Sequence, residues 1–172
     1  MKTAKKVREK IYDVMWEGPY NLEVAKKRSK KDHVLYAIFG THSVYGQNVL
    51  LYIGLTETTV AQRLSEHTWL RQEYDVVTVR FASIGEFPDI ESWWKDWMKN
   101  NRDKKDRTPY RRPKSNTIQA LEKILIYAHQ PACNSKNIEE FTIDNRLDIR
   151  RIFNTGRLGP LLPEISEAYF TE

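Results

Sequence analysis

The sequence predicts an α+β fold built on a small three-stranded antiparallel sheet flanked by helices. Two amphipathic stretches near residues 60–70 and 116–129, each with an N-terminal capping pattern, predict the flanking helices. The turn-forming residues of 40–48 are expected to join the first two strands as an antiparallel hairpin. The three strands are predicted from short apolar and aromatic runs at residues 34–39, 49–53 and 76–84.

Length and composition set the broad class of the protein. A chain of 172 residues suits one domain with a sizeable core and extra segments at its ends. The formal net charge of +5 favours an anionic partner without requiring one. No apolar run approaches the roughly 18 residues that a membrane span needs, and no apolar signal segment follows the charged N-terminus. We therefore expect a soluble, intracellular protein of the cytoplasm that has no membrane partner.

The segments outside the central region are expected to add to a core at residues 33–134. Residues 1–32 are interpreted as a basic N-terminal helix and linker, because apolar residues recur at helical spacing over residues 3–16. Residues 135–172 are interpreted as a C-terminal extension that packs on the core. Within it, residues 148–153 are expected to form a short helix.

The stretch LLYIGLTETTVAQRLSEH, residues 50–67, carries most of the functional information. A short apolar strand ends at Gly54, and the spacing of Thr59 and Gln62 predicts a capping box, so that a helix begins near residue 60. Arg63 and His67 are four residues apart and therefore lie on one face of that helix. The end of the strand, the glycine and this helix face together have the side chains to hold a phosphate.

The same stretch resembles the second half of the motif of GIY-YIG nucleases. Tyr52-Ile53-Gly54, followed by Arg63 and His67, corresponds to that half. The first half corresponds to Val34-Leu35-Tyr36, where Val34 replaces the opening glycine of the family.

A third part of the resemblance lies downstream, in LEKILIYAHQPACN. There Glu122 belongs to a predicted helix, and Asn134 follows the end of that helix. The resemblance covers roughly residues 33–134. It implies a GIY-YIG-like fold and a nuclease active site.

The resemblance implies a role for each of these side chains. Tyr36 corresponds to the tyrosine that is the family's usual candidate general base, and Tyr52 would position water or phosphate. Arg63 presents a fork that matches two phosphate oxygens. His67 would supply or relay a proton.

Two further residues correspond to the metal site and its surroundings. Glu122 corresponds to the metal-binding glutamate, and Asn134 would support the site, as would Gly54. Mg²⁺ (or Mn²⁺) keeps several waters, so that one carboxylate is chemically adequate as its protein ligand.

Two basic runs are candidates for contacts with nucleic-acid phosphates. One precedes the first strand, and the other is a loop of residues 102–114 that holds seven Lys or Arg against two Asp. Either run is also compatible with a solvated surface. The residues predicted to bind nucleic acid are Lys26, Lys27, Arg28, Lys30, Lys31, Lys104, Lys105, Arg107, Arg111, Arg112 and Lys114.

The sequence thus predicts a metal-dependent endonuclease that hydrolyses phosphodiester bonds in DNA, with duplex DNA as its partner. Two alternatives remain open: a non-catalytic binding module with the same fold, and a nuclease of structured RNA. One active site per chain predicts a monomer that nicks DNA or a dimer that forms on it.

Overall fold

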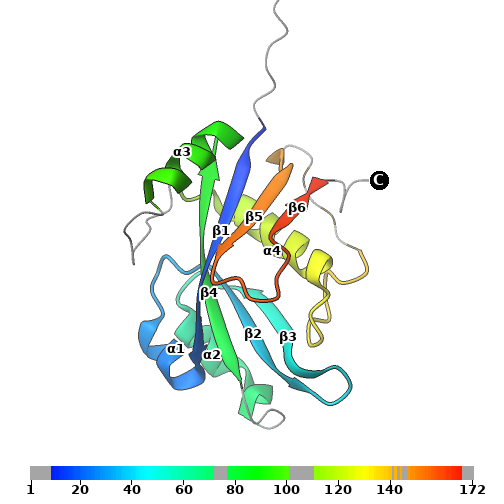
Figure 1. Cartoon of the computed structure of the whole chain (residues 1–172). Coiled ribbons are helices and arrows are strands. Elements are labelled where there is room, and N and C mark those ends of the chain that lie inside the picture. Colours follow the sequence, from blue (N-terminus) through cyan, green and yellow to red (C-terminus); the bar gives the residue numbers. More distant parts are fainter. Residues whose placement is uncertain are drawn as a thin grey trace, which may run out of the picture.

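The computed structural model describes residues 9–71, 77–100, 111–140, 142, 144 and 147–167. Within these residues, six strands form one mixed, curled sheet in the order β3-β2-β4-β1-β5-β6 (Figure 1). All neighbouring strands are antiparallel except β1 and β5, which are parallel. The strands are β1 (Ile11–Asn21), β2 (Leu35–His42), β3 (Gly46–Leu55), β4 (Thr78–Phe87), β5 (Arg151–Gly156) and β6 (Glu164–Ser166).

Four α-helices and one 3₁₀ helix accompany the sheet in the described part of the chain. Figure 1 shows α4 passing behind the strands, and α1 and α2 lying side by side. The helices are α1 (Leu22–Arg28), α2 (Val60–Glu66), α3 (Ile90–Asn100), α4 (Ser115–His129) and the 3₁₀ helix η1 (Thr68–Arg71). Among the described residues, no helix combines the length and the apolar character needed to cross a membrane.

The predicted three-stranded sheet is wrong, because β1, β5 and β6 extend it to six strands. The three strands that the sequence predicts are present as β2, β3 and β4, and β2 pairs antiparallel with both of the others. The predicted third strand began at Val76, which lies outside the described residues. The added strands come from the two ends of the chain, which were expected to lie outside the sheet.

The predicted N-terminal helix is wrong from Ile11 onward, where the chain enters β1. The side chains from Ile11 to Val14 are all buried, because β1 lies between β4 and β5 and both of its faces are covered. A strand buried on both sides shows no polar alternation, so its apolar run is easily taken for a buried helix. The preceding residues 1–8 lie outside the described part.

The predicted short helix at residues 148–153 is also wrong. Residues Arg151–Gly156 form β5, which lies parallel to β1 with Ile152 opposite Tyr12. The segment from Arg157 to Pro163, here called the 157–163 loop, then leads into β6. Its first amide is anchored to the central strand, because Arg157 N donates to Trp16 O at 2.7 Å.

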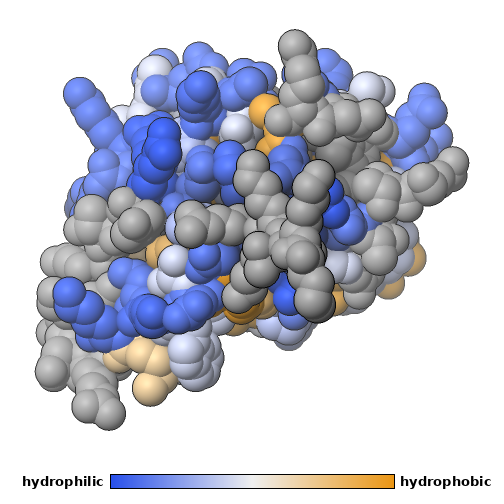
Figure 2. Space-filling model, turned by 90° about the horizontal axis from the view of Figure 1, so that it is seen from above, coloured by the Kyte–Doolittle hydropathy of each residue, from blue (hydrophilic) through white to orange (hydrophobic). Residues whose placement is uncertain are grey.

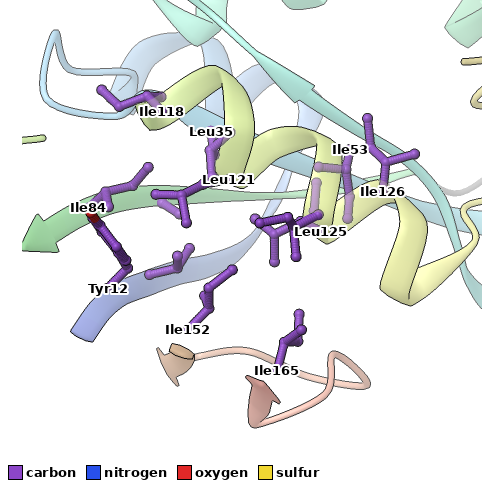
Figure 3. Close-up of a cluster of buried hydrophobic side chains, with 14 of the residues drawn as sticks. Tyr12, Leu35, Ile53, Ile84, Ile118, Leu121, Leu125, Ile126, Ile152 and Ile165 are labelled. Carbon is purple, nitrogen blue, oxygen red and sulfur yellow. The ribbon is translucent and has the colours of Figure 1, made fainter. Parts of the chain in front are cut away.

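The core consists of two clusters on opposite faces of the sheet. On one face, Leu121 and Leu125 of α4 pack toward Tyr12, Ile84 and the C-terminal strands (Figure 3). On the other face, the short helices α1 and α2 cover the odd-numbered side chains of β4 and the even-numbered side chains of β2. The predicted capping pattern of α4, with Asn116 as the cap and Gln119 three residues later, is wrong. The helix begins at Ser115, two residues before such a cap would allow, and its N-cap residue, Lys114, makes no side-chain capping bond.

Helix α3 lies at one end of the sheet and is only partly covered. The Trp93 ring stacks on Phe153 of β5 at a centroid distance of 4.4 Å, whereas Ile90, Trp94 and Met98 are exposed. In the view from above, the described surface is largely hydrophilic with small hydrophobic areas (Figure 2). Most of the apolar side chains are therefore taken up by the two core clusters.

Candidate active site

The side chains predicted to act on a phosphate come from four elements that meet beside the end of β3. Tyr36 lies in β2, Tyr52 in β3, Arg63 in α2 and Glu122 in α4, and His67 is the C-cap residue of α2. A ring contact, a hydrogen bond or a charge effect links each of them to at least one other member. Tyr36 is buried and the other four are partly exposed, so that a ligand has access to the group.

Gly54 makes room for the two tyrosine rings. It pairs with Tyr36 across the β2–β3 ladder, and the rings of Tyr36 and Tyr52 stack with their centroids 5.9 Å apart. A Cβ on Gly54 would come within 2.5 Å of Tyr52 Cε1 and 2.6 Å of the Tyr36 hydroxyl oxygen. Glycine is therefore required at this position on steric grounds, because any side chain here would push the two tyrosine rings apart.

The predicted N-cap of α2 at Thr59 is confirmed, but the helix ends at Glu66 instead of near residue 70, so that His67 is its C-cap and does not lie on its face. Thr59 is the N-cap residue, and its hydroxyl oxygen accepts a hydrogen bond from the Gln62 amide at 3.3 Å. Val60 and Leu64 are buried against the sheet. The helix is thereby fixed in rotation, and Arg63 comes into contact with the tyrosines.

His67 is held between Tyr36 and a tryptophan that sequence reasoning missed. Its Nε2 lies 2.7 Å from the Tyr36 hydroxyl, and Trp69 Nε1 donates to its Nδ1 at 3.2 Å. An indole N–H can only donate, so Nδ1 must accept, and the proton of the neutral imidazole must be on Nε2. His67 therefore donates to the Tyr36 oxygen.

Burial lowers the pKa of His67, and the nearby Arg63 guanidinium lowers it further. The hydrogen bond from Trp69 acts in the same direction, because a protonated imidazole has no acceptor for it. In this arrangement His67 is neutral at neutral pH. It is thus poised to stabilise negative charge on Tyr36, and it cannot receive a proton at Nε2 from that tyrosine.

The two tyrosines are held in the neutral form. Burial raises the pKa of Tyr36, and its proximity to Tyr52 adds to this rise, whereas Arg63 opposes it. Burial also raises the pKa of Tyr52, and the charge of Glu122 contributes. For either phenol to act as a base, its phenolate needs the support of the cation and of the His67 N–H.

The Arg63 guanidinium combines a link to the site with partial exposure. It forms an ion pair with Glu66 one turn further along the helix, and it also hydrogen-bonds to Tyr36. A guanidinium stays charged throughout the accessible pH range and presents several donors in a plane. Arg63 therefore has the charge and the donors to receive a phosphate beside the tyrosines.

Glu122 is the carboxylate of the group and lies where α4 passes β3. Burial raises the pKa of its carboxyl, whereas a hydrogen bond from the Leu55 amide and the charge of Arg63 act in the opposite direction. Among the described residues, no cation forms an ion pair with Glu122. A partly buried carboxylate held by one amide retains an oxygen for a further partner.

Asn134 fastens the segment after α4 to the outer edge of β3. Its side chain accepts from Ile53 N and donates to Ile53 O, both at 3.0 Å, which reproduces the pairing of a neighbouring strand. The amides of Ala132 and Cys133 also donate to carbonyls of β3, at 3.1 and 2.7 Å. These bonds flank Tyr52 and tie it to the helix that carries Glu122.

The donor set suits a hard divalent cation that keeps most of its waters. No group of three or more His, Cys, Asp or Glu side chains gathers for a metal ion anywhere in the described ranges. Glu122 offers one carboxylate, close enough to Tyr52 for its charge to act on that phenol, and no described cation forms an ion pair with it. Mg²⁺ binds in this way, through one or two carboxylates together with water and substrate phosphate.

The basic runs are only partly described. Lys26, Lys27 and Arg28 form the last turn of α1, which contacts α2, and the Ala61 amide of α2 donates to Ser29 Oγ at 3.0 Å. The first basic run, which also includes the loop residues Lys30 and Lys31, thus lies beside the helix that carries Arg63. In the second run, Arg111, Arg112 and Lys114 are exposed, whereas Lys104, Lys105 and Arg107 lie outside the described residues.

Sequence reasoning missed two contributors to the site. Trp69 fixes the tautomer of His67, and its only signal in the sequence is an indole two positions after a candidate histidine. The Leu55 amide, which holds Glu122, gives no signal, because a backbone donor is independent of residue type. Comparison with protein-family models, curated proteins and solved structures finds no match for this chain.

Proposed function

We propose that the protein is a metal-dependent endonuclease that hydrolyses phosphodiester bonds in DNA, as its resemblance to GIY-YIG nucleases implies. The observation that supports this best is the meeting of two tyrosines, an arginine, a histidine and a glutamate from four elements. Packing alone does not require such a group. Tyr36 is buried and Glu122 partly buried, and burial raises the pKa of each.

Each side chain has a role that follows from its contacts. The Arg63 fork binds the scissile phosphate and neutralises charge that develops on it. Tyr36, as a phenolate supported by Arg63 and the His67 N–H, takes a proton from the attacking water. Tyr52 hydrogen-bonds to Tyr36 and lies close enough to Glu122 for its charge to act on the phenol. From this position Tyr52 orients that water.

Glu122 would hold the divalent cation, Mg²⁺ or Mn²⁺, which polarises the phosphate and stabilises the leaving oxygen. The Leu55 amide orients the Glu122 carboxylate. Trp69 orients His67, so that the proton on Nε2 faces the Tyr36 oxygen. In this scheme one chain cuts one strand per encounter, as a monomer or as a dimer assembled on DNA.

One observation favours the alternative of a non-catalytic binding module. The Tyr36 side chain has no exposed surface, and a base that never meets water cannot deprotonate it. The Val34 residue in place of the family's opening glycine points the same way. In that case the Arg63 face would bind nucleic acid and leave it uncut.

The test is incubation of the purified chain with supercoiled plasmid, with and without Mg²⁺ or Mn²⁺. We expect metal-dependent nicking that Glu122→Ala reduces on the order of a thousandfold, because it removes the cation ligand. Glu86→Ala is the matched control, since Glu86 is a partly buried glutamate of β4 that forms an ion pair with Lys10.

Three results would contradict or redirect the proposal. Metal-independent cleavage that survives Glu122→Ala would point to a contaminating nuclease. Tight binding of the plasmid without any cleavage would favour the binding module. Preferential cleavage of a structured RNA in direct competition would replace DNA as the substrate.

A further inference from the structure

The Arg63 guanidinium already holds an anion that belongs to the protein itself. Its Nη1 donates to Oε2 of Glu66, three residues further along the chain. Among the described residues, Glu66 is the only carboxylate that forms an ion pair with Arg63. A carboxylate and a phosphate both present a pair of oxygens to a guanidinium, so that they compete for the same donors. A phosphate that binds Arg63 must therefore displace Glu66 or share the guanidinium with it.

The stability of helix α2 does not account for a carboxylate at this position. The helix ends at Glu66. The C-terminal end of a helix carries partial negative charge, which makes a carboxylate unfavourable there. Ion pairs within a helix are also more favourable when the acid precedes the base, whereas here Arg63 precedes Glu66. The feature that distinguishes Glu66 is therefore its contact with the cation of the candidate active site.

The ion pair lies between the tyrosines and the solvent. The side chains of Arg63 and Glu66 are 42% and 45% exposed, so that a ligand can reach both. Arg63 also hydrogen-bonds to the buried Tyr36. Burial and Arg63 lower the pKa of His67, and the charge of Glu66 is close enough to oppose them. Glu66 thus acts on both side chains that contact the Tyr36 hydroxyl.

An exposed ion pair of this kind is weak enough to exchange its anion. Water screens the attraction, and holding two long side chains in one geometry costs conformational entropy. A phosphate that reaches Arg63 keeps the cation paired, so that the exchange leaves no unpaired charge in the site except the released Glu66 carboxylate, which is at the surface. That carboxylate then lies close to the phosphate and repels it.

We propose that Glu66 is an internal competitor of the substrate: its carboxylate occupies the Arg63 guanidinium in the free protein, and a phosphate of the nucleic-acid backbone displaces it. Glu66 thereby lowers the affinity of the site for phosphates. The inference rests on the proposed function in one point, the binding of a backbone phosphate by Arg63. It does not depend on cleavage.

The first experiment measures binding of a short DNA duplex to the full chain in EDTA, so that no cleavage interferes. Glu66→Gln keeps the shape of the side chain and removes its charge, so that affinity should rise by about fivefold at low ionic strength. Glu91→Gln is the control, because Glu91 forms an exposed ion pair with Lys95 in α3 and the change in net charge is the same. Its affinity should rise by about twofold at most.

The same two changes are then made in Arg63→Gln. Because Glu66 acts through Arg63, its removal should now have no larger effect than the removal of Glu91. An equal gain in both backgrounds would overturn the proposal, as would a gain in Glu66→Gln that only equals the gain in Glu91→Gln. Absence of duplex binding by both the wild type and Glu66→Gln would also overturn it. If Arg63→Gln binds too weakly to measure, the comparison of Glu66→Gln with Glu91→Gln decides.

A second arm measures cleavage with Mg²⁺ and separates this inference from the proposed function. Glu66→Gln should lower KM, so that kcat/KM rises by about fivefold. An ion pair that only held the helix together would have the opposite effect, a lower stability and a lower kcat/KM. If binding follows the expected pattern and no protein cleaves, the endonuclease proposal fails and the inference stands. If the wild type cleaves and Glu66→Gln behaves like Glu91→Gln, the inference fails and the endonuclease proposal stands.

Discussion

Glu122 and Arg80 lie in two different regions of the molecule and raise the same question of how a charge removed from water is compensated. Each is a charged residue taken out of water, and neither forms an ion pair within the described part of the chain. Their surroundings differ. Glu122 lies among titratable side chains and receives the Leu55 amide, whereas Arg80 lies among an aromatic ring and backbone atoms.

The difference matters because only one of the two can become neutral. A buried carboxylate can take up a proton, and the raised pKa of Glu122 shows this tendency. A guanidinium has no such route and needs an anion, an acceptor or water. The comparison therefore favours a bound cation at Glu122, whereas Arg80 keeps its charge and is held by a backbone oxygen and an aromatic ring, and the following experiments test this difference.

The largest expected effect comes from Tyr36→Phe, which keeps the ring above Gly54 and removes the hydroxyl. If Tyr36 is the general base, cleavage should fall by about a hundredfold to ten-thousandfold. Affinity for DNA in EDTA should stay close to that of the wild type. Tyr12→Phe serves as the control, because Tyr12 is equally buried and belongs to the other core cluster. A loss of cleavage that only parallels a loss of folded protein would assign Tyr36 to packing.

Trp69→Phe should have the next largest effect, because it removes the donor that fixes the tautomer of His67. We expect a loss of cleavage of about tenfold, in the range of other residues that orient a catalytic group. With Nδ1 free, the pKa of His67 should rise, and the acidic limb of the pH profile should move to higher pH. Nitrogen chemical shifts of the imidazole would report the tautomer directly.

Trp16→Phe is the matched control for this change. Trp16 also donates from Nε1, to Asn154 Oδ1 at 2.9 Å, but it lies in the core. It should lower stability and leave the His67 tautomer unchanged. An unaltered tautomer in Trp69→Phe would remove the orienting role from Trp69.

A smaller effect is expected from the second basic run, through the combined change of Arg107, Arg111 and Arg112 to Gln. Each phosphate contact that is lost should lower the slope of log affinity against log salt by about one. Cleavage at saturating DNA should not change, since none of the three belongs to the site. If affinity and slope both stay constant, the run is a solvated surface.

The predicted strands 34–39 and 49–53 and the cap at Thr59 could be found from sequence because their signals are local. An apolar run that ends in a glycine, or a hydroxyl three residues before an amide partner, does not depend on the rest of the chain. The strand β1 could not be found in this way, because its burial on both faces results from pairing with β4 and β5. The same holds for β5, whose parallel partner β1 precedes it by about 140 residues along the chain.

The candidate site also contains residues that can be found from local sequence patterns and residues that matter only through tertiary contacts. Resemblance named Tyr36, Tyr52, Arg63, His67 and Glu122 from spacing, and the structure places them together. Trp69 and the Leu55 amide act on the site only through contacts in the folded chain, which the spacing of residues in the sequence does not reveal. Arg80 had one local signal, since it is a cation in phase with the buried residues Ala82 and Ile84 of the same strand.

The smallest expected effect is on stability, and it separates Glu122 from Arg80 most directly. Because burial raises the folded-state pKa of Glu122, its contribution to stability is fully present below the pKa of the unfolded chain, near pH 4. It is lost as pH rises through the folded-state pKa. Gln does not titrate, so that Glu122→Gln, measured in EDTA by denaturant unfolding, should gain stability relative to the wild type as pH increases to neutral.

Arg80→Lys supplies the contrast, because neither arginine nor lysine titrates in this range. The difference in unfolding free energy between Arg80→Lys and the wild type should stay constant from acid to neutral pH in phosphate-free buffer. A pH-dependent difference at Arg80 would reveal a titrating carboxylate partner and remove the contrast with Glu122. A pH-independent difference at Glu122 would mean that its charge is already compensated within the protein, and the reason for assigning a cation there would be lost.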